Sequence, residues 1–118
     1  MQDKRISIRA HLMGVKAKIS PDGKTWTEVS AVDISDGGIG FTSDAEYHRG
    51  ETLKIQTEIS DFLRTMEIDC DIKVIFVGNK GDGYTYGCKF MHMGKAEHTA
   101  LSIFIELMVT KHPSLLIE

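Results

Sequence analysis

The sequence has only two cysteines and no clustered histidines, and these shortages argue against a disulfide and against a metal site. Cys70 and Cys88 both lie within alternating apolar stretches. This setting favours reduced core thiols over a disulfide or a zinc site with four ligands. The five histidines form no H-x-x-x-H or H-E-x-x-H pattern, so we expect no metal site and no metal cofactor.

Long apolar runs and an excess of positive charge are also missing. The charged start, Met1 to Arg5, has no apolar segment behind it, so we expect no signal peptide, no membrane insertion and a cytoplasmic protein. The net charge of -3 argues against binding a nucleic acid polymer, which needs a face dense in Lys and Arg. No P-loop and no nucleophile beside a base is recognisable, so we expect no enzymatic activity.

What the sequence does contain is a series of short strands. With 118 residues and 42% hydrophobic content, the chain fits one domain that buries roughly two-thirds of its unfolded surface. Apolar and polar residues alternate with the period of two that is typical of half-buried strands. The first expected strand begins at Met13. The other five cover residues 26–35, 39–42, 53–59, 67–76 and 84–90. In this pattern Met13 and Phe76 belong to the inward-facing set.

The period changes after Gly94. Four apolar residues then follow at helical spacing, and Pro113 ends the segment: Leu101, Phe104, Ile105 and Met108. Six strands followed by one helix predict a mainly β protein, a small antiparallel barrel or sandwich with a C-terminal α-helix. Residues 1–10 carry little apolar content, so we expect an N-terminal arm over 1–10 and the folded body over 11–118.

A polar, glycine-rich turn stands between the second and third expected strands. Asp33 and Ser35 alternate with aliphatic residues, so the carboxylate and the hydroxyl share one face of an extended backbone. Gly37 and Gly38 follow, which permits φ > 0 and lets a ligand approach the backbone closely. The alternative is ordinary turn chemistry, in which the Asp and Ser side chains cap backbone amides.

Two arginines, Arg5 and Arg9, stand four residues apart in the expected arm. A guanidinium group binds phosphate oxygens bidentately, pairs with the N7 and O6 acceptors of guanine, and stacks on a base. A carboxylate such as Asp33 accepts hydrogen bonds from guanine N1 and N2. Arginines and turn together therefore suit an anionic guanine nucleotide, whereas the arginines alone would be an ordinary solvated basic segment.

With these residues the chain resembles the PilZ domain family, whose members are receptors for the bacterial second messenger cyclic di-GMP. The family motif R-x-x-x-R reads here Arg5-Ile6-Ser7-Ile8-Arg9. The second motif, [D/N]-x-S-x-x-G, reads Asp33-Ile34-Ser35-Asp36-Gly37-Gly38. The sixth expected strand, with Tyr86-Gly87-Cys88-Lys89-Phe90, is similar to the last-strand signature of the family.

The resemblance implies a six-stranded antiparallel barrel, the split barrel of that family, with the arm wrapped over a ligand on its surface. It implies that Arg5 and Arg9, with Lys4 beside them, take phosphate and guanine. Asp33, Ser35 and Gly38, with Gly37 beside them, would line the other guanine. In this family an arginine in the place of Lys4 is associated with binding the messenger as a stacked dimer, so one ligand or two are both compatible with this sequence.

The expected function is therefore a cyclic di-GMP receptor or adaptor whose arm orders on binding. It would regulate an effector protein, such as motility, adhesion or biofilm machinery. The alternative is a PilZ-like interaction module that acts without nucleotide. The helix carries a second apolar row, Ala100, Ile103 and Leu107, which predicts either deep burial against the barrel or a surface for a homodimer or another partner.

Overall fold

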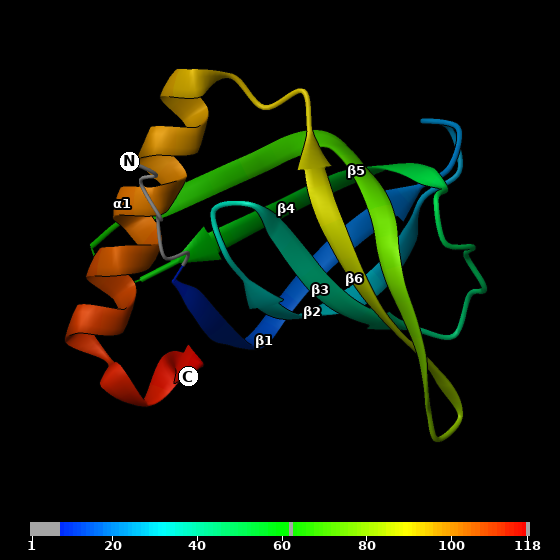
Figure 1. Cartoon of the computed structure of the whole chain (residues 1–118), viewed down its shortest axis with the longest axis horizontal. Coiled ribbons are helices and arrows are strands. Elements are labelled where there is room, and N and C mark those ends of the chain that lie inside the picture. Colours follow the sequence, from blue (N-terminus) through cyan, green and yellow to red (C-terminus); the bar gives the residue numbers. More distant parts are fainter. Residues whose placement is uncertain (1–7, 62, 118) are drawn as a thin grey trace, which may run out of the picture.

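The computed structural model describes residues 8–61 and 63–117. Within them the chain forms a series of antiparallel strands and one long helix (Figure 1). The strands are β1 (Arg9–Ser20), β2 (Thr27–Ile34), β3 (Gly38–Ser43), β4 (Thr52–Ser60), β5 (Thr65–Lys80), β6 (Gly83–Met91) and β7 (Leu116–Ile117). The helix is α1 (Lys95–Lys111), and a short 3-10 turn, Pro113–Leu115, joins it to β7.

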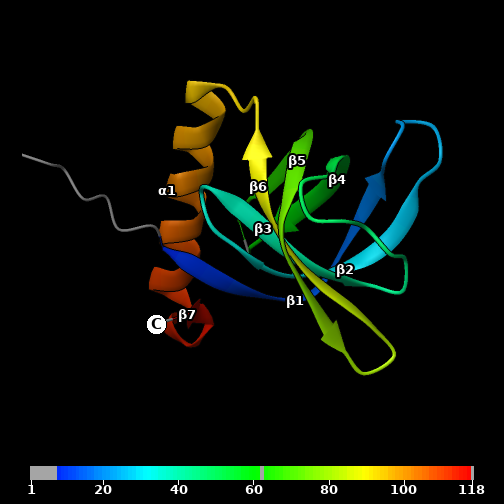
Figure 2. The same cartoon turned by 45° about the vertical axis from the view of Figure 1, so that its right-hand side comes forward.

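Six of the strands close into a barrel. Their hydrogen-bonded order is β2-β3-β6-β5-β4-β1, and β1 also pairs with β2. Every pairing is antiparallel, and β7 adds to the free part of β1 beside Arg9. Figure 2 shows α1 standing beside one end of the barrel. The predicted mainly β fold, a six-stranded antiparallel barrel with a C-terminal helix, is confirmed, and β7 is an addition.

The helix forms as the sequence predicts. The backbone N–H of Gly94 donates to Glu97 Oε1 at 3.1 Å, which satisfies a group next to the first turn. The buried face consists of Leu101, Phe104, Ile105, Met108 and Val109. Within the described residues no helix is long and apolar enough to cross a membrane.

The second apolar row of α1 is not buried against the barrel. Ala100, Ile103 and Leu107 lie on the exposed side of the helix, and Leu116 of β7 is also exposed. The alternative of deep burial is therefore wrong for this row.

Two strands break the simple alternation, and both breaks correct the sequence reading. The register of β1 shifts between His11 and Val15, where Gly14 has φ +69°. The shift reverses the inward phase, because Ala10 is buried on one side of it and Ala17 on the other. The strand also begins at Arg9 rather than at Met13, and the prediction that Met13 faces inward is wrong, since it is 80% exposed.

The second break lies in β5. Val74 pairs with Cys88, whereas the next pair along the strands joins Phe76 to Gly87, so Ile75 is an extra residue on this strand. Such a bulge turns the following residues over to the other face. Phe76 is therefore exposed, and the prediction that it faces the core is wrong.

The core contains an aromatic cluster held by one tyrosine hydroxyl. The Tyr86 ring lies 5.1 Å from Phe41 and 5.4 Å from Tyr47. Its hydroxyl accepts the backbone N–H of Tyr47 at 2.9 Å and donates to the carbonyl of Ala45 at 2.8 Å. This side chain ties the loop after β3 to strand β6.

We predict that Tyr86→Phe lowers the free energy of unfolding by about 1–3 kcal/mol, because the buried N–H of Tyr47 then has no partner. Tyr84→Phe is the control, since its hydroxyl forms no hydrogen bond with a described residue, and it should change stability by less than about 0.5 kcal/mol. Urea denaturation of both variants tests this, and equal losses would contradict the assignment.

Candidate functional site

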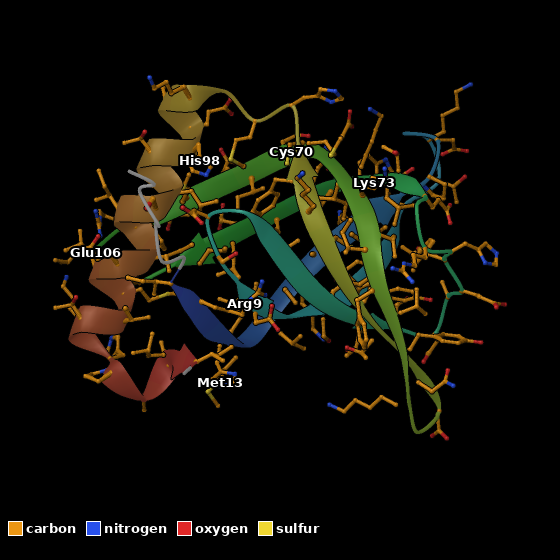
Figure 3. All side chains as sticks on the ribbon, viewed as in Figure 1. Arg9, Met13, Cys70, Lys73, His98 and Glu106 are labelled. Carbon is orange, nitrogen blue, oxygen red and sulfur yellow. The ribbon has the colours of Figure 1, made fainter. Side chains whose placement is uncertain are left out.

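Arg9 of the first motif and Asp33 of the second meet on the outer face of the barrel, at the start of β1 and near the end of β2. His11 pairs with Asp33 across these strands, so Arg9, two residues from His11, is a diagonal neighbour of Asp33 on the same face. Arg9 Nη1 donates to Asp33 Oδ1 at 2.5 Å. The side chains are 45% and 25% exposed, so water still reaches both groups. Figure 3 shows Arg9 on β1.

The structure thus brings Arg9 and Asp33 together. Arg5 and Lys4, the other predicted cations of the site, lie outside the described residues. Their contribution stays a prediction. Arg9 and Ala10, which the sequence placed in the arm, already belong to β1, and they pair there with Ile117 and Leu116 of β7.

The turn after β2 is shaped by its own backbone and one side chain. The N–H of Ser35 donates to the carbonyl of Gly38 at 2.9 Å, and the N–H of Gly37 donates to Ser35 Oγ at 3.2 Å. The N–H of Phe90 donates to the carbonyl of Gly37 at 3.0 Å, which fastens the turn to β6. Ser35 thus caps a backbone amide, as the alternative reading of this motif expected.

The conformation of the turn corrects one expectation. Neither Gly37 nor Gly38 has a positive φ. The need for glycine at position 38 comes from close packing instead. A Cβ there would lie 2.1 Å from the carbonyl oxygen of Cys88, so β6 occupies the space that a side chain would need.

Asp36, within the same turn, was not singled out by sequence reasoning. It is buried, and its Oδ2 lies 3.7 Å from Nε2 of His98 on α1. Figure 3 shows His98 on the helix. The contact connects the turn to the helix. No local signal in the sequence indicates it, because the two residues are 62 positions apart and come together only when α1 packs beside the barrel.

Two further glycines, which the sequence did not single out, share this face, and the strand register reveals them. Asp33 pairs with Gly40, Gly40 with Gly87, and Gly87 with Phe76, across β2, β3, β6 and β5. Residues directly opposite each other in antiparallel strands point to the same face. The four therefore form one row on the outside of the barrel. We call Gly40 and Gly87, which leave this row without side chains between Asp33 and Phe76, the glycine floor.

Gly40 also sets the position of Asp33. A Cβ at residue 40 would lie 2.8 Å from Asp33 Oδ1. The carboxylate therefore lies over the bare backbone of β3. Any side chain at position 40 would move it.

A groove of about 440 Å³ opens beside this row. Four of the predicted site residues line it, namely Arg9, Ser35, Gly37 and Gly38. The rest of the lining comes from strands β5 and β6: Ile75, Phe76, Gly87, Cys88 and Lys89. Asp33 is not part of the lining and borders it through its contact with Arg9. A groove of about 490 Å³ elsewhere on the barrel is lined by four acidic residues, Glu28, Glu58, Glu67 and Asp69, and by two basic ones, Lys16 and Lys18. Its net charge is therefore negative, which disfavours an anion.

The groove contains one thiol group, and burial keeps it protonated. Cys88 lines the groove, and burial raises the pKa of this thiol to about 12, so it is not a thiolate near neutral pH. Burial, with Asp71 and Asp69 nearby, likewise raises the pKa of Cys70 to about 11. Both cysteines are free, as predicted. Among the described residues no three metal-ligating side chains come together.

We predict opposite outcomes for two neighbouring glycine substitutions. Gly38→Ala should lower the free energy of unfolding by at least about 2 kcal/mol, because its methyl overlaps backbone that cannot rotate away. Gly40→Ala should change it by less than about 1 kcal/mol, because the Asp33 carboxylate ends a side chain that can turn aside. Thermal and urea unfolding measure both, and an intact Gly38→Ala variant would contradict the packing argument.

Comparison with known proteins identifies a matching family model. The model of the PilZ domain matches residues 2–107. No curated protein sequence matches the chain.

Solved structures share the fold. The PilZ domain of YcgR from Escherichia coli, solved with c-di-GMP, is 12% identical with a TM-score of 0.71, and the match covers 95% of this chain and 96% of that one. Bacillus subtilis MotI/DgrA, an inhibitor of motility, is 17% identical with a TM-score of 0.75, covering 93% and 53%. The K. pneumonia MrkH complex with c-di-GMP is 17% identical with a TM-score of 0.69, covering 96% and 56%. This chain spans about half the length of the MotI and MrkH chains.

Proposed function

The chain belongs to the PilZ domain family, and from that membership we propose that it is a receptor for cyclic di-GMP that regulates an effector protein. The observation that carries the proposal is the contact between Arg9 and Asp33 at 2.5 Å, beside the groove. These residues come from motifs 24 positions apart. In this proposal Arg9 binds phosphate or guanine and Asp33 binds guanine, and their contact supports a shared site.

The groups on this face fit the chemistry of the ligand. The guanidinium of Arg9 suits phosphate oxygens or the N7 and O6 edge of guanine. The carboxylate of Asp33 suits the N1 and N2 hydrogens on the opposite edge. Both are partly exposed, and an ion pair of this kind is worth only about 0–1 kcal/mol. A ligand can therefore replace the pair at little cost.

Arg5 and Lys4 supply the remaining cations in this proposal. Because Arg9 already belongs to β1, the part that orders on binding is the segment before it, which carries Arg5. Ordering of such a segment by charge pairing with phosphate is a common form of molecular switch. The surface shown to the effector would change with it.

The structural neighbours suggest what kind of effector to test. YcgR and MrkH were solved with c-di-GMP, MotI is an inhibitor of motility, and MrkH is described as a transcription regulatory factor. We propose that this chain likewise acts on motility, adhesion or biofilm machinery. The exposed row of Ile103, Leu107 and Leu116 favours a second candidate, an interaction module that contacts a partner without nucleotide.

Calorimetric titration of the purified chain with cyclic di-GMP separates these candidates. The receptor proposal predicts saturable heat with a Kd in the micromolar range or tighter at moderate salt, and the fitted stoichiometry distinguishes one ligand from two. Arg9→Ala and Arg5→Ala should each weaken binding at least about 30-fold, because a phosphate or base loses its charged partner.

Arg49→Ala is the matched control for charge. Arg49 is exposed in the loop before β4 and forms no ion pair with a described residue, so its loss should change the Kd less than twofold. GTP and cyclic di-AMP are the ligand controls. Absence of heat with the wild-type chain would reject the receptor and leave the interaction module.

A further inference from the structure

Strand β5 presents an apolar surface at the edge of the groove. Ile75, Phe76 and Val77 are consecutive, and all three are exposed, Phe76 to 58%. Ile75 and Phe76 line the groove opposite the Ser35–Gly38 turn. The bulge at Ile75 is the cause, because it turns Phe76 out of the core. A large exposed apolar group beside a polar site indicates a surface that a ligand covers.

The space around Phe76 is kept free by glycines. Gly87 lies directly opposite on β6, and a Cβ there would come within 3.4 Å of the Phe76 Cβ. On its own strand, a Cβ at Gly78 would lie 3.1 Å from Cε2 and Cζ of the ring. The ring thus leans along β5 over Gly78. Toward β2 the glycine floor continues through Gly40 to Asp33.

The dimensions of this row suit a nucleotide with two bases. Asp33 and Phe76 are separated by three strand spacings, at most about 14 Å along the sheet. The floor between them carries no side chain, so a planar base can approach the backbone. One end offers a carboxylate that reads guanine, and the other offers an aromatic ring for stacking.

A second row, next to the first, carries positive charge. Lys89 on β6 pairs with Gly38 on one side and with Lys73 on the other. Like charges directly opposite each other destabilise a strand pair. Neither lysine forms an ion pair with a described residue to relieve this. Lys89 lines the groove, so an anion bound there would meet an unpaired ammonium group. Figure 3 shows Lys73 on β5.

We propose that β5 and β6 form a second half of the ligand site, in which Phe76 stacks a base across the glycine floor and Lys89 meets a phosphate. This inference rests on the proposed function and extends it. The residues Phe76, Gly87 and Lys89 belong to neither the arginine motif nor the Asp33–Gly38 motif. They determine how tightly the far half of the dinucleotide binds.

Titration of the full chain with cyclic di-GMP tests whether Phe76 stacks on a base. Phe76→Ala should weaken binding about 5- to 100-fold, the range seen when a base loses its stacking partner, and Phe76→Trp should restore it. Ile103→Ala, which removes an equally exposed apolar group from α1, should leave the Kd within twofold. Urea unfolding of each variant shows whether the fold is retained.

Separate variants test the roles of Lys89 and of Gly87 in the glycine floor. Lys89→Ala should weaken binding more at low salt than at high salt, whereas Lys24→Ala, a control in the exposed turn after β1, should have little effect. Gly87→Ala adds a methyl group that the fold tolerates. It should nevertheless lower the affinity for cyclic di-GMP, because the methyl group occupies space that the ligand needs above the backbone of β6.

A spectroscopic readout locates the base directly. In Phe76→Trp, a guanine stacked on the new indole should quench fluorescence beyond any change of Trp26 in the wild type. If the wild type binds but Phe76→Ala and Gly87→Ala bind as tightly as Ile103→Ala, with no added quenching, this inference is overturned and the receptor stands. If the wild type binds no ligand, the receptor and this inference fall together.

Discussion

The close approach of β3 to β6 at Gly38 is the constraint on which the rest of the site depends. The carbonyl of Cys88 occupies the place where a side chain at position 38 would stand. With the strands this close, the carbonyl of Gly37 accepts the N–H of Phe90, which holds the turn against β6. The same register sets Lys89 beside Gly38. The close packing of β3 against β6 thus aligns the turn with the residues of β6 that line the groove.

The charged groups on this face differ in their exposure to water. Asp36 is buried in the turn, and its Oδ2 lies 3.7 Å from Nε2 of His98 on the helix. Arg9 and Asp33, in contrast, are paired where water reaches them, and such a pair contributes little to stability. In the proposed bound state, a ligand would replace the exposed pair and leave the scaffold intact.

Much of the fold could be predicted from local pattern. Period-two alternation located the six strands, and helical spacing after Gly94 located α1 and its buried face. Where the pattern failed, a bulge was the reason. Gly14 and Ile75 each shift the inward phase, so Met13 and Phe76 face outward although the alternation assigns both to the core. A bulge depends on pairing with another strand, and local alternation does not record that pairing.

The candidate site divides in the same way. Recognisable motifs predicted Arg9, Asp33 and Ser35 as site residues, and the structure brings Arg9 and Asp33 into contact. Gly40, Gly87 and Lys89 join the site only through the register of four strands, which a single sequence does not specify. Gly38 was predicted to let a ligand approach closely, which stays a prediction. The structure adds that the backbone of β6 occupies the space that a side chain there would need.

The most direct test of this account is a structure of the chain bound to cyclic di-GMP. The account predicts that the ligand lies across Gly40 and Gly87, with guanine on the carboxylate of Asp33 and the guanidinium of Arg9 turned from Asp33 to a phosphate or a base. A ligand bound elsewhere on the barrel, with the Arg9–Asp33 ion pair intact, would contradict it.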